Sequence, residues 1–212
     1  MITQSIKHIS DNLIEITTFE KGILYTIEVI DVYTCKLNGP YKKYHPDGQL
    51  WDEANYVNGE LHGSYKQYFE NGQLFFETNH LNGKYHGIYK TYHTNGKLHV
   101  ETTYVNGEYH GIYKTYHPDG QLNVEANNIN GKIHGPYKQY HPNGQLLNET
   151  NYLNGKRHGS YKSYHPDGQL SIDANYINGE PHGPYKIYHD NGQLSTEASH
   201  INGELQHDNT IN

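Results

Sequence analysis

Short runs of alternating apolar and polar residues, separated by glycine, make up most of this sequence. The segment 135–158 shows the pattern: GPYKQYHPNGQLLNETNYLNGKRH. Tyr137 and Tyr140 frame one short run, and a second extends from Leu146 to Tyr152. Helical periodicity is missing from the pattern, and the density of glycine and asparagine would break helices. Each segment of this kind predicts two β-strands.

The same segment recurs with a period of 24 residues. Seven units follow one another from residue 39 to residue 206 without insertion or deletion, and each opens on a glycine: Gly39, Gly63, Gly87, Gly111, Gly135, Gly159 and Gly183. In each unit a loop of the HPNG type joins the two strands, and a second Asn-Gly turn leads to the next unit; Asn-Gly and Asp-Gly are strong hairpin signals. The sequence predicts an all-β fold, an elongated single-layer twisted antiparallel β-meander of tandem 24-residue hairpin repeats.

The register of each hairpin has two alternatives. A two-residue turn on Asn143-Gly144 places Lys138 opposite Glu149, and this Lys/acid pair recurs in other units. A three-residue loop with a bulge places Tyr140 opposite Leu146, and the prolines before the turns favour this longer loop. A slip of one residue exchanges the two faces of the sheet, so the register decides which tyrosines lie beside the leucines.

Parity along the second strand predicts the composition of the two faces. Residues four apart in a regular strand lie on the same side. The leucine after each loop, such as Leu146, is therefore expected to share the more apolar face with the Ala or Thr four residues later, such as Thr150. The acids and asparagines are expected on the opposite face.

The chain is predicted to have three parts. Residues 1–38 form an N-terminal cap with a degenerate hairpin, in which FEKG at 19–22 stands where FENG stands at 69–72, and which covers the edge of the sheet. Residues 39–206 form the seven repeats. Residues 207–212 form a frayed tail.

Composition excludes several classes of protein. Only 33% of the residues are apolar, so a thick two-layer core is not expected, whereas 22 tyrosines and 22 glycines are atypical of a disordered chain. The net charge of −7 has the wrong sign for a general nucleic-acid binder. No signal peptide or transmembrane segment is recognisable, and the single cysteine, Cys35, favours a reducing compartment. We therefore expect an intracellular, cytoplasmic protein, in the host cytoplasm if the source is a virus.

The repeated phrase resembles a known repeat. The Tyr-Lys-x-Tyr of 137–140, the Asn-Gly turns and the His-Gly of 158–159 are similar to those of MORN-repeat proteins, specifically the variant repeat of bacterial antitoxin-like and large-DNA-virus proteins. The unit is one residue longer than the standard MORN repeat and has Glu149 in place of a glycine. The resemblance implies an extended twisted sheet used as a scaffold, in a family linked to phospholipid association, dimerisation and protein docking.

No residue pattern indicates catalysis or a cofactor. Histidines recur at two positions of the repeat, but equivalent residues in successive units are roughly 9.6 Å apart, which is too far to share one zinc ion. No nucleophile elbow, phosphate-binding glycine loop or HExxH motif occurs. We predict no catalytic site, no cofactor and no metal site, and therefore not an enzyme. Protonation of the histidines predicts a loss of stability between pH 7 and 5.

The most plausible function is that of a non-catalytic scaffold that presents an extended sheet face to a protein partner or to a second copy of itself as a homodimer. One alternative is a peripheral membrane adaptor, whose lysine row binds acidic phospholipid head groups. The other, from the resemblance alone, is an antitoxin-like protein that sequesters a toxin. The predicted interaction face contains Tyr65, Tyr89, Tyr113, Tyr137, Tyr161, Lys66, Lys90, Lys114, Lys138 and Lys162.

Overall fold

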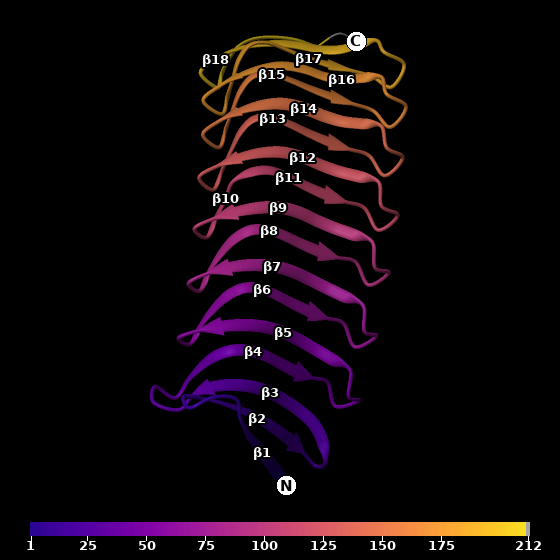
Figure 1. The fold of residues 1–212 in the computed structure, drawn as a ribbon. Coiled ribbons are helices and arrows are strands. Elements are labelled where there is room, and N and C mark those ends of the chain that lie inside the picture. Colours follow the sequence, from indigo (N-terminus) through magenta and orange to yellow (C-terminus); the bar gives the residue numbers. More distant parts are fainter. Residues whose placement is uncertain (211–212) are drawn as a thin grey trace. The chain divides into compact units, whose positions relative to one another are not determined.

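The computed structural model describes the backbone of residues 1–210 and the side chains of residues 1–206. Every regular element in this part of the chain is a β-strand, and each strand runs antiparallel to its chain neighbours within the two compact units of the fold (Figure 1). The predicted all-β fold of tandem antiparallel hairpins is confirmed.

The first unit comprises residues 1–108 and contains nine complete strands in chain order. These are β1 (Ile2–His8), β2 (Leu13–Glu20), β3 (Ile23–Asp31), β4 (Lys36–Tyr44), β5 (Leu50–Val57), β6 (Glu60–Tyr68), β7 (Leu74–Leu81), β8 (Lys84–Tyr92) and β9 (Leu98–Val105). The short strand β10 (Glu108–Tyr109) lies at the boundary between the units.

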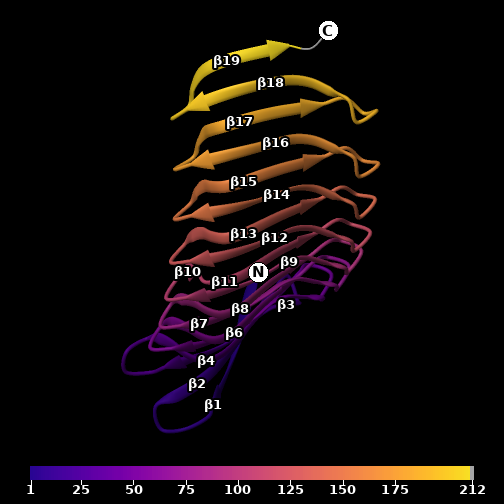
Figure 2. The ribbon, with the colours of Figure 1, turned by 90° about the horizontal axis from the view of Figure 1, so that it is seen from above.

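The second unit comprises residues 109–212 and repeats the same arrangement. Its strands are β11 (Gly111–Tyr116), β12 (Leu122–Ile129), β13 (Lys132–Tyr140), β14 (Leu146–Leu153), β15 (Lys156–Tyr164), β16 (Leu170–Ile177), β17 (Glu180–Tyr188), β18 (Leu194–Ile201) and β19 (Glu204–Thr210). Figure 2 shows that in this unit the longer loops lie at one end of the strands and the Asn-Gly turns at the other.

The longer loop contains three residues, as the prolines indicate. Between β13 and β14, the amide of His141 donates to the carbonyl of Gln145 over 2.8 Å, and the amide of Gly144 donates to the carbonyl of His141 over 2.8 Å. Gly144 has φ 83°, the left-handed conformation that glycine adopts readily. Asn143 fixes the turn further, because its side-chain oxygen accepts from the amide of Gln145 at 3.0 Å. The loop is a type I turn followed by a glycine bulge.

A second bulge reconciles the two registers that the sequence left open. Tyr140 pairs with Leu146, but Gln139 pairs with Asn148, so Leu147 is an extra residue in β14. Beyond this point Lys138 pairs with Glu149. Both predicted pairs therefore occur in the same hairpin. The same shift follows the loop in each of the other six repeats.

The extra residue also changes which side chains share a face of the sheet, so the prediction from strand parity is wrong. Leu146 lies on the side of its partner Tyr140 and hence of Lys138 and Glu149, whereas Thr150 pairs with Tyr137 and lies on the other side. The leucines therefore share a face with the lysines, the acids and the second tyrosine of each repeat. A bulge reverses the alternation of side chains for the rest of the strand.

The Asn-Gly turns have two residues and are joined to their neighbours. Leu153 pairs with Lys156 around Asn154-Gly155, and Asn154 has φ 53°, which asparagine tolerates better than other residues. The amide of Gly155 donates to the carbonyl of Ile133 in the preceding repeat over 2.8 Å. The repeats are thus held together at the turns as well as along the strands.

A further irregularity follows each Asn-Gly turn, and an asparagine side chain bridges it. The register shifts between Ala126 and Asn128, opposite the His-Gly pair at 134–135. Asn127 lies at this point, and its side-chain nitrogen donates to the carbonyl of His134 at 3.2 Å. Asn55 and Asn175 make the same bond to His62 and His182. In these three repeats the asparagine two residues after the acid therefore stabilises the irregular backbone.

The two ends extend the sheets beyond the repeats. β1 pairs with β2 along its whole length, and β2 with β3, so the residues predicted as a cap form three strands and the start of β4. At the other end β19 pairs with β18 up to Thr210. Of the tail expected to fray at 207–212, residues 207–210 are therefore paired, and 211–212 lie outside the described residues.

Candidate functional site

Two faces of contrasting chemistry follow from the register. The tyrosine face carries the first tyrosine of each repeat, the Ala or Thr opposite it, and the residue six positions after each leucine; in one repeat these are Tyr137, Thr150 and Tyr152. The lysine face carries Lys138, Tyr140, Leu146 and Glu149. Each unit has both faces.

The ten residues predicted as one interaction face lie on both. Tyr65 and Lys66 are consecutive in a strand and pair with Thr78 and Glu77, so their side chains lie on opposite sides of the sheet. The tyrosine face therefore holds Tyr65, Tyr89, Tyr113, Tyr137 and Tyr161, and the lysine face holds Lys66, Lys90, Lys114, Lys138 and Lys162. The sequence predicted a single face that combines both rows. The strand geometry corrects this prediction, because it separates the two rows onto opposite faces of the sheet.

On the lysine face positive charge is balanced by acids. Ion pairs join Lys90 to Glu101 at 3.2 Å, Lys114 to Glu125 at 3.2 Å and Lys186 to Glu197 at 3.3 Å. The second tyrosine of a repeat adds a hydrogen bond to the acid of the adjacent strand, as in Tyr68 to Glu53 at 2.8 Å, Tyr92 to Glu77 at 2.7 Å and Tyr164 to Glu149 at 3.0 Å. The row of lysines is therefore not a free positive stripe.

Aromatic rings form a contiguous cluster on the tyrosine face of the first unit. Tyr65 packs against Phe76 with ring centroids 5.2 Å apart, Phe76 against Tyr89 at 5.8 Å, and Tyr89 against Tyr104 at 5.5 Å. His80 lies among them, 4.7 Å from Tyr85. Offset and edge-to-face pairs of this kind contribute about 0.5–1.5 kcal/mol each beyond burial, so the rings stabilise the single sheet.

In the second unit the tyrosines pack in pairs over small residues. Tyr137 lies edge-on to Tyr152 at 5.6 Å, and Tyr161 to Tyr176 at 5.7 Å. The residues beneath them are among the most buried of the unit: Ala126, Thr150, Ala174 and Ala198 are all at most 9% exposed. Burial raises the pKa of Tyr137, and also that of Tyr113 and Tyr185, so these hydroxyls stay protonated at neutral pH.

The tyrosine face is hollowed in the second unit. A shallow depression of about 500 Å³ lies among β11, β12 and β13, between Tyr113 and Tyr137. Val124, Asn128 and Ile133 are among the other residues that line it. Its volume is within the range of ligand pockets, roughly 300–1,000 Å³, and its walls are aromatic and uncharged.

Histidines that precede the longer loops have structural partners. His141 uses its Nε2 to contact the carbonyl of Tyr164 in the next repeat at 3.1 Å, and His165 contacts the carbonyl of Tyr188 at 3.3 Å. A carbonyl only accepts, so Nε2 carries the hydrogen in these loops. Among the described residues, no group of three or more His, Cys, Asp or Glu side chains could hold a metal ion.

Comparison with protein families matches the repeat itself. A family described as MORN repeat variant matches residues 37–58, 61–82, 85–106, 109–128, 133–154, 157–178 and 181–202. Together these segments make up well over half of the chain. The chain belongs to the MORN repeat variant family. The seven matched segments are the seven repeats predicted from the glycine period. No curated protein matches the sequence.

MORN repeats are a non-enzymatic repeat family. Every matched segment after the first begins just past an Asn-Gly turn and ends at the next one or shortly before it. A match therefore contains the longer loop and most of the two strands around it. No helix in the described residues is long and apolar enough to cross a membrane.

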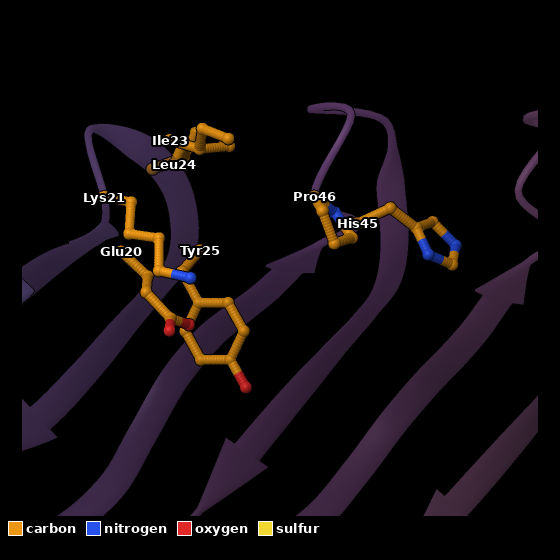
Figure 3. Close-up of a pocket in the computed structure, with 7 residues that line it drawn as sticks. All are labelled: Glu20, Lys21, Ile23, Leu24, Tyr25, His45 and Pro46. Atoms are coloured by element: carbon orange, nitrogen blue, oxygen red, sulfur yellow. The ribbon is translucent and has the colours of Figure 1, made fainter.

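A small pocket lies at the loop end of the first unit, between residues that precede the MORN repeats and the longer loop of the first repeat (Figure 3). It has a volume of about 180 Å³ and lies between the β2–β3 turn, with Lys21 and Ile23, and the loop after β4, with His45 and Pro46. Tyr25 lines it from β3, and the ring of His45 points away from Lys21 and Tyr25 in Figure 3. This volume is below the range of ligand pockets. The tyrosine face is the better candidate site.

Proposed function

We propose that this MORN-repeat chain is a non-catalytic scaffold whose tyrosine face binds a protein partner. The observation that carries the proposal is the contrast between the faces: the lysine face neutralises its charges within the sheet, whereas the tyrosine face presents half-buried aromatic rings with few charges. Tyrosine is enriched at the centres of protein interfaces, where its ring gives contact area at little entropic cost.

The membrane adaptor predicted as an alternative depends on the lysine row. Cytoplasmic lipid recognition uses clusters of about four to eight uncompensated Lys or Arg residues, whereas these lysines are opposite acids. Flotation with vesicles that contain about 10% phosphatidylinositol phosphate tests this alternative. Recovery of the chain with these vesicles, but not with neutral ones, would support the adaptor and contradict our proposal.

The experiment for the tyrosine face uses residues that the repeat already tolerates. Asp52 occupies, in the first repeat, the position of Asn148 and Ile172 in later ones. The double variant Asn148→Asp and Ile172→Asp therefore adds two negative charges to this face within the limits of the fold. The control variant carries Lys138→Gln and Lys162→Gln on the opposite face.

The readout is affinity capture from cells of the source organism, with quantitative mass spectrometry. We expect proteins bound by the natural chain to be lost with the tyrosine-face variant and retained with the control variant. Retention by the tyrosine-face variant, or equal loss with both variants, would contradict the proposal. Circular dichroism of each variant checks that the sheet is intact.

A further inference from the structure

Arg157 is the only arginine of the chain, and it lies in β15 on the tyrosine face, opposite Tyr152. Its guanidinium carbon is 4.8 Å from the ring centroid of Tyr161 and 5.5 Å from that of Tyr176. Rings on two strands therefore hold the guanidinium in a fixed position, which is the geometry of a cation–π contact.

Nothing of opposite charge accompanies this cation. Over strands β11 to β18, Arg157 is the only Asp, Glu, Lys or Arg residue that the register places on the tyrosine face. Among the described residues, no carboxylate lies within ion-pair distance of its nitrogens. A guanidinium has five N–H donors in a planar fork that matches a carboxylate, and the tyrosine contacts leave part of that fork without an acceptor.

The first unit offers an internal comparison. Lys43 lies on the same face, with its Nζ 4.0 Å from the ring centroid of Trp51 and 5.3 Å from that of Tyr25. Directly opposite Lys43 in the sheet is Asp52, whose carboxylate Lys43 attracts. The aromatic-bound cation of the first unit thus faces a carboxylate on the neighbouring strand, beyond ion-pair distance but near enough for attraction, whereas the residue opposite Arg157 is Tyr152. The positions of the second unit that correspond to Asp52 are Val124, Asn148, Ile172 and Thr196.

We propose that Arg157 binds a carboxylate side chain of an extended peptide segment in a partner protein. The inference rests on the proposed function and specifies the chemistry of the partner. The site consists of the guanidinium and the tyrosines around it: Tyr137, Tyr152, Arg157, Tyr161, Tyr176 and Tyr185.

The composition of the site favours a peptide over a lipid or a free phosphate. One cation among uncharged rings matches one carboxylate flanked by apolar residues, whereas recognition of a charged lipid surface uses several cations. The tyrosines of successive repeats are roughly 9.6 Å apart, and one three-residue turn of a polyproline II helix spans about 9.3 Å. An extended segment in this conformation that crosses the strands can therefore place every third side chain over the tyrosines of successive repeats.

The probe is a phage-displayed library of random linear dodecapeptides, selected on the full chain. Binding of the strongest selected peptide is then measured by fluorescence anisotropy, together with a matched peptide in which every carboxylate is replaced by a carboxamide. We expect Asp or Glu in the selected peptides. We expect the carboxamide peptide to bind at least about tenfold more weakly, because hydrogen bonds to charged groups are among the stronger ones.

Three variants assign the effect to the guanidinium. Arg157→Ile uses the residue of the preceding repeat, Ile133, so the fold tolerates it. We expect this variant to bind the selected peptide at least about tenfold more weakly than the natural chain does. We also expect it to bind the selected peptide and the carboxamide peptide equally well. Arg157→Lys should bind with intermediate affinity, because an ammonium lacks the planar fork. Lys162→Gln, on the opposite face of the same strand, should leave affinity unchanged.

The outcomes separate this inference from the proposed function. Peptides that need no carboxylate, or that bind Arg157→Ile as well as the natural chain, overturn the inference. If such peptides are lost with the Asn148→Asp and Ile172→Asp variant, the tyrosine face still binds peptide and the proposed function stands. If no peptide is selected, or if Lys162→Gln alone weakens binding, both are overturned. Urea unfolding of Arg157→Ile verifies that the variant is folded.

Discussion

The close packing of Gly39 against Val29 gives a quantitative test of the fold. Gly39 lies in β4 at the irregular point opposite β3, and Val29 is 2% exposed. A Cβ atom added to Gly39 would lie 3.1 Å from both Cβ and Cγ1 of Val29. Gly39 also has φ 136°, a backbone conformation that side chains rarely adopt. Gly39→Ala therefore combines backbone strain with overpacking.

The equivalent glycine of the next repeat separates these two effects. Gly63 also has positive φ, 87°, but a Cβ atom there would meet nothing within 4 Å. We expect Gly63→Ala to reduce the free energy of unfolding by about 1–2 kcal/mol, the magnitude of left-handed strain. Overpacking adds about 1–3 kcal/mol at Gly39. The expected loss for Gly39→Ala is therefore about 2–5 kcal/mol.

Replacement of Val29 should relieve the overpacking. Val29→Ala alone removes two buried methylene equivalents and leaves a cavity, a loss of about 2–3 kcal/mol. In the double variant the new methyl group of residue 39 fills part of that space. The double variant should therefore lose at least about 1 kcal/mol less than the sum of the single variants, as contacting residues in a mutant cycle do.

The assay is urea unfolding followed by the fluorescence of Trp51, the only tryptophan. Trp51 lies in β5, next to the strand that contains Gly39, so its signal reports on this part of the first unit. Equal losses for Gly39→Ala and Gly63→Ala, or strict additivity with Val29→Ala, would refute the packing argument.

Three further predictions concern pH, a hydrogen bond and a turn. Burial lowers the pKa of His80, so the stability that neutral His80 contributes is complete above its ordinary pKa near 6.5 and is lost as the pH falls below that value. His80→Tyr introduces the residue found at the equivalent position of the next repeat, Tyr104, and should reduce the difference in unfolding free energy between pH 7 and pH 5. An unchanged difference would count against this assignment. Tyr164→Phe removes the hydrogen bond to Glu149 and should lower the free energy of unfolding in urea by about 1 kcal/mol. Tyr140→Phe, at the equivalent position of the preceding repeat, should lower it less, because among the described residues the hydroxyl of Tyr140 has no such bond. Equal losses would exclude the hydrogen bond as the cause. Asn154 has φ 53°, so Asn154→Ala should lower the free energy of unfolding by about 1 kcal/mol, whereas Asn154→Gly should not. Thermal melting measures both variants, and a lower melting temperature for the glycine variant than for the alanine variant would contradict the turn assignment.

Much of the fold was predictable because the repeat marks its own turns. The glycine period and the Asn-Gly and Pro-Asn-Gly sequences gave the hairpins, both kinds of turn and the boundaries of the repeats. The bulge at Leu147 was not predictable, because no residue type is specific to it and its position depends on how two strands pair. Counting by twos across that residue placed Leu146 beside Thr150, which is wrong.

The candidate site was harder to predict for the same reason. The alternation of Tyr137 and Lys138 already indicates opposite faces, but the composition of each face depends on the bulges in the neighbouring strand. The position of Arg157 beside Tyr161 and Tyr176 also depends on an irregular pairing, in which Tyr152 lies opposite Arg157 and Thr150 opposite Tyr161. The sequence signal that could have identified it is its singularity, since the chain has no other arginine.

The hydrogen bonds at the two ends of the strands affect how such a chain can change length. His141 contacts the repeat that follows through Tyr164, and Gly155 contacts the repeat that precedes through Ile133. Excision or duplication of 24 residues within a unit gives every turn a new neighbour with the same acceptor group, whereas a single inserted residue leaves one turn misaligned. Recombination between copies can therefore change the number of repeats while it preserves the hydrogen bonds between neighbouring repeats. Genes for such arrays are thus free to gain or lose whole repeats.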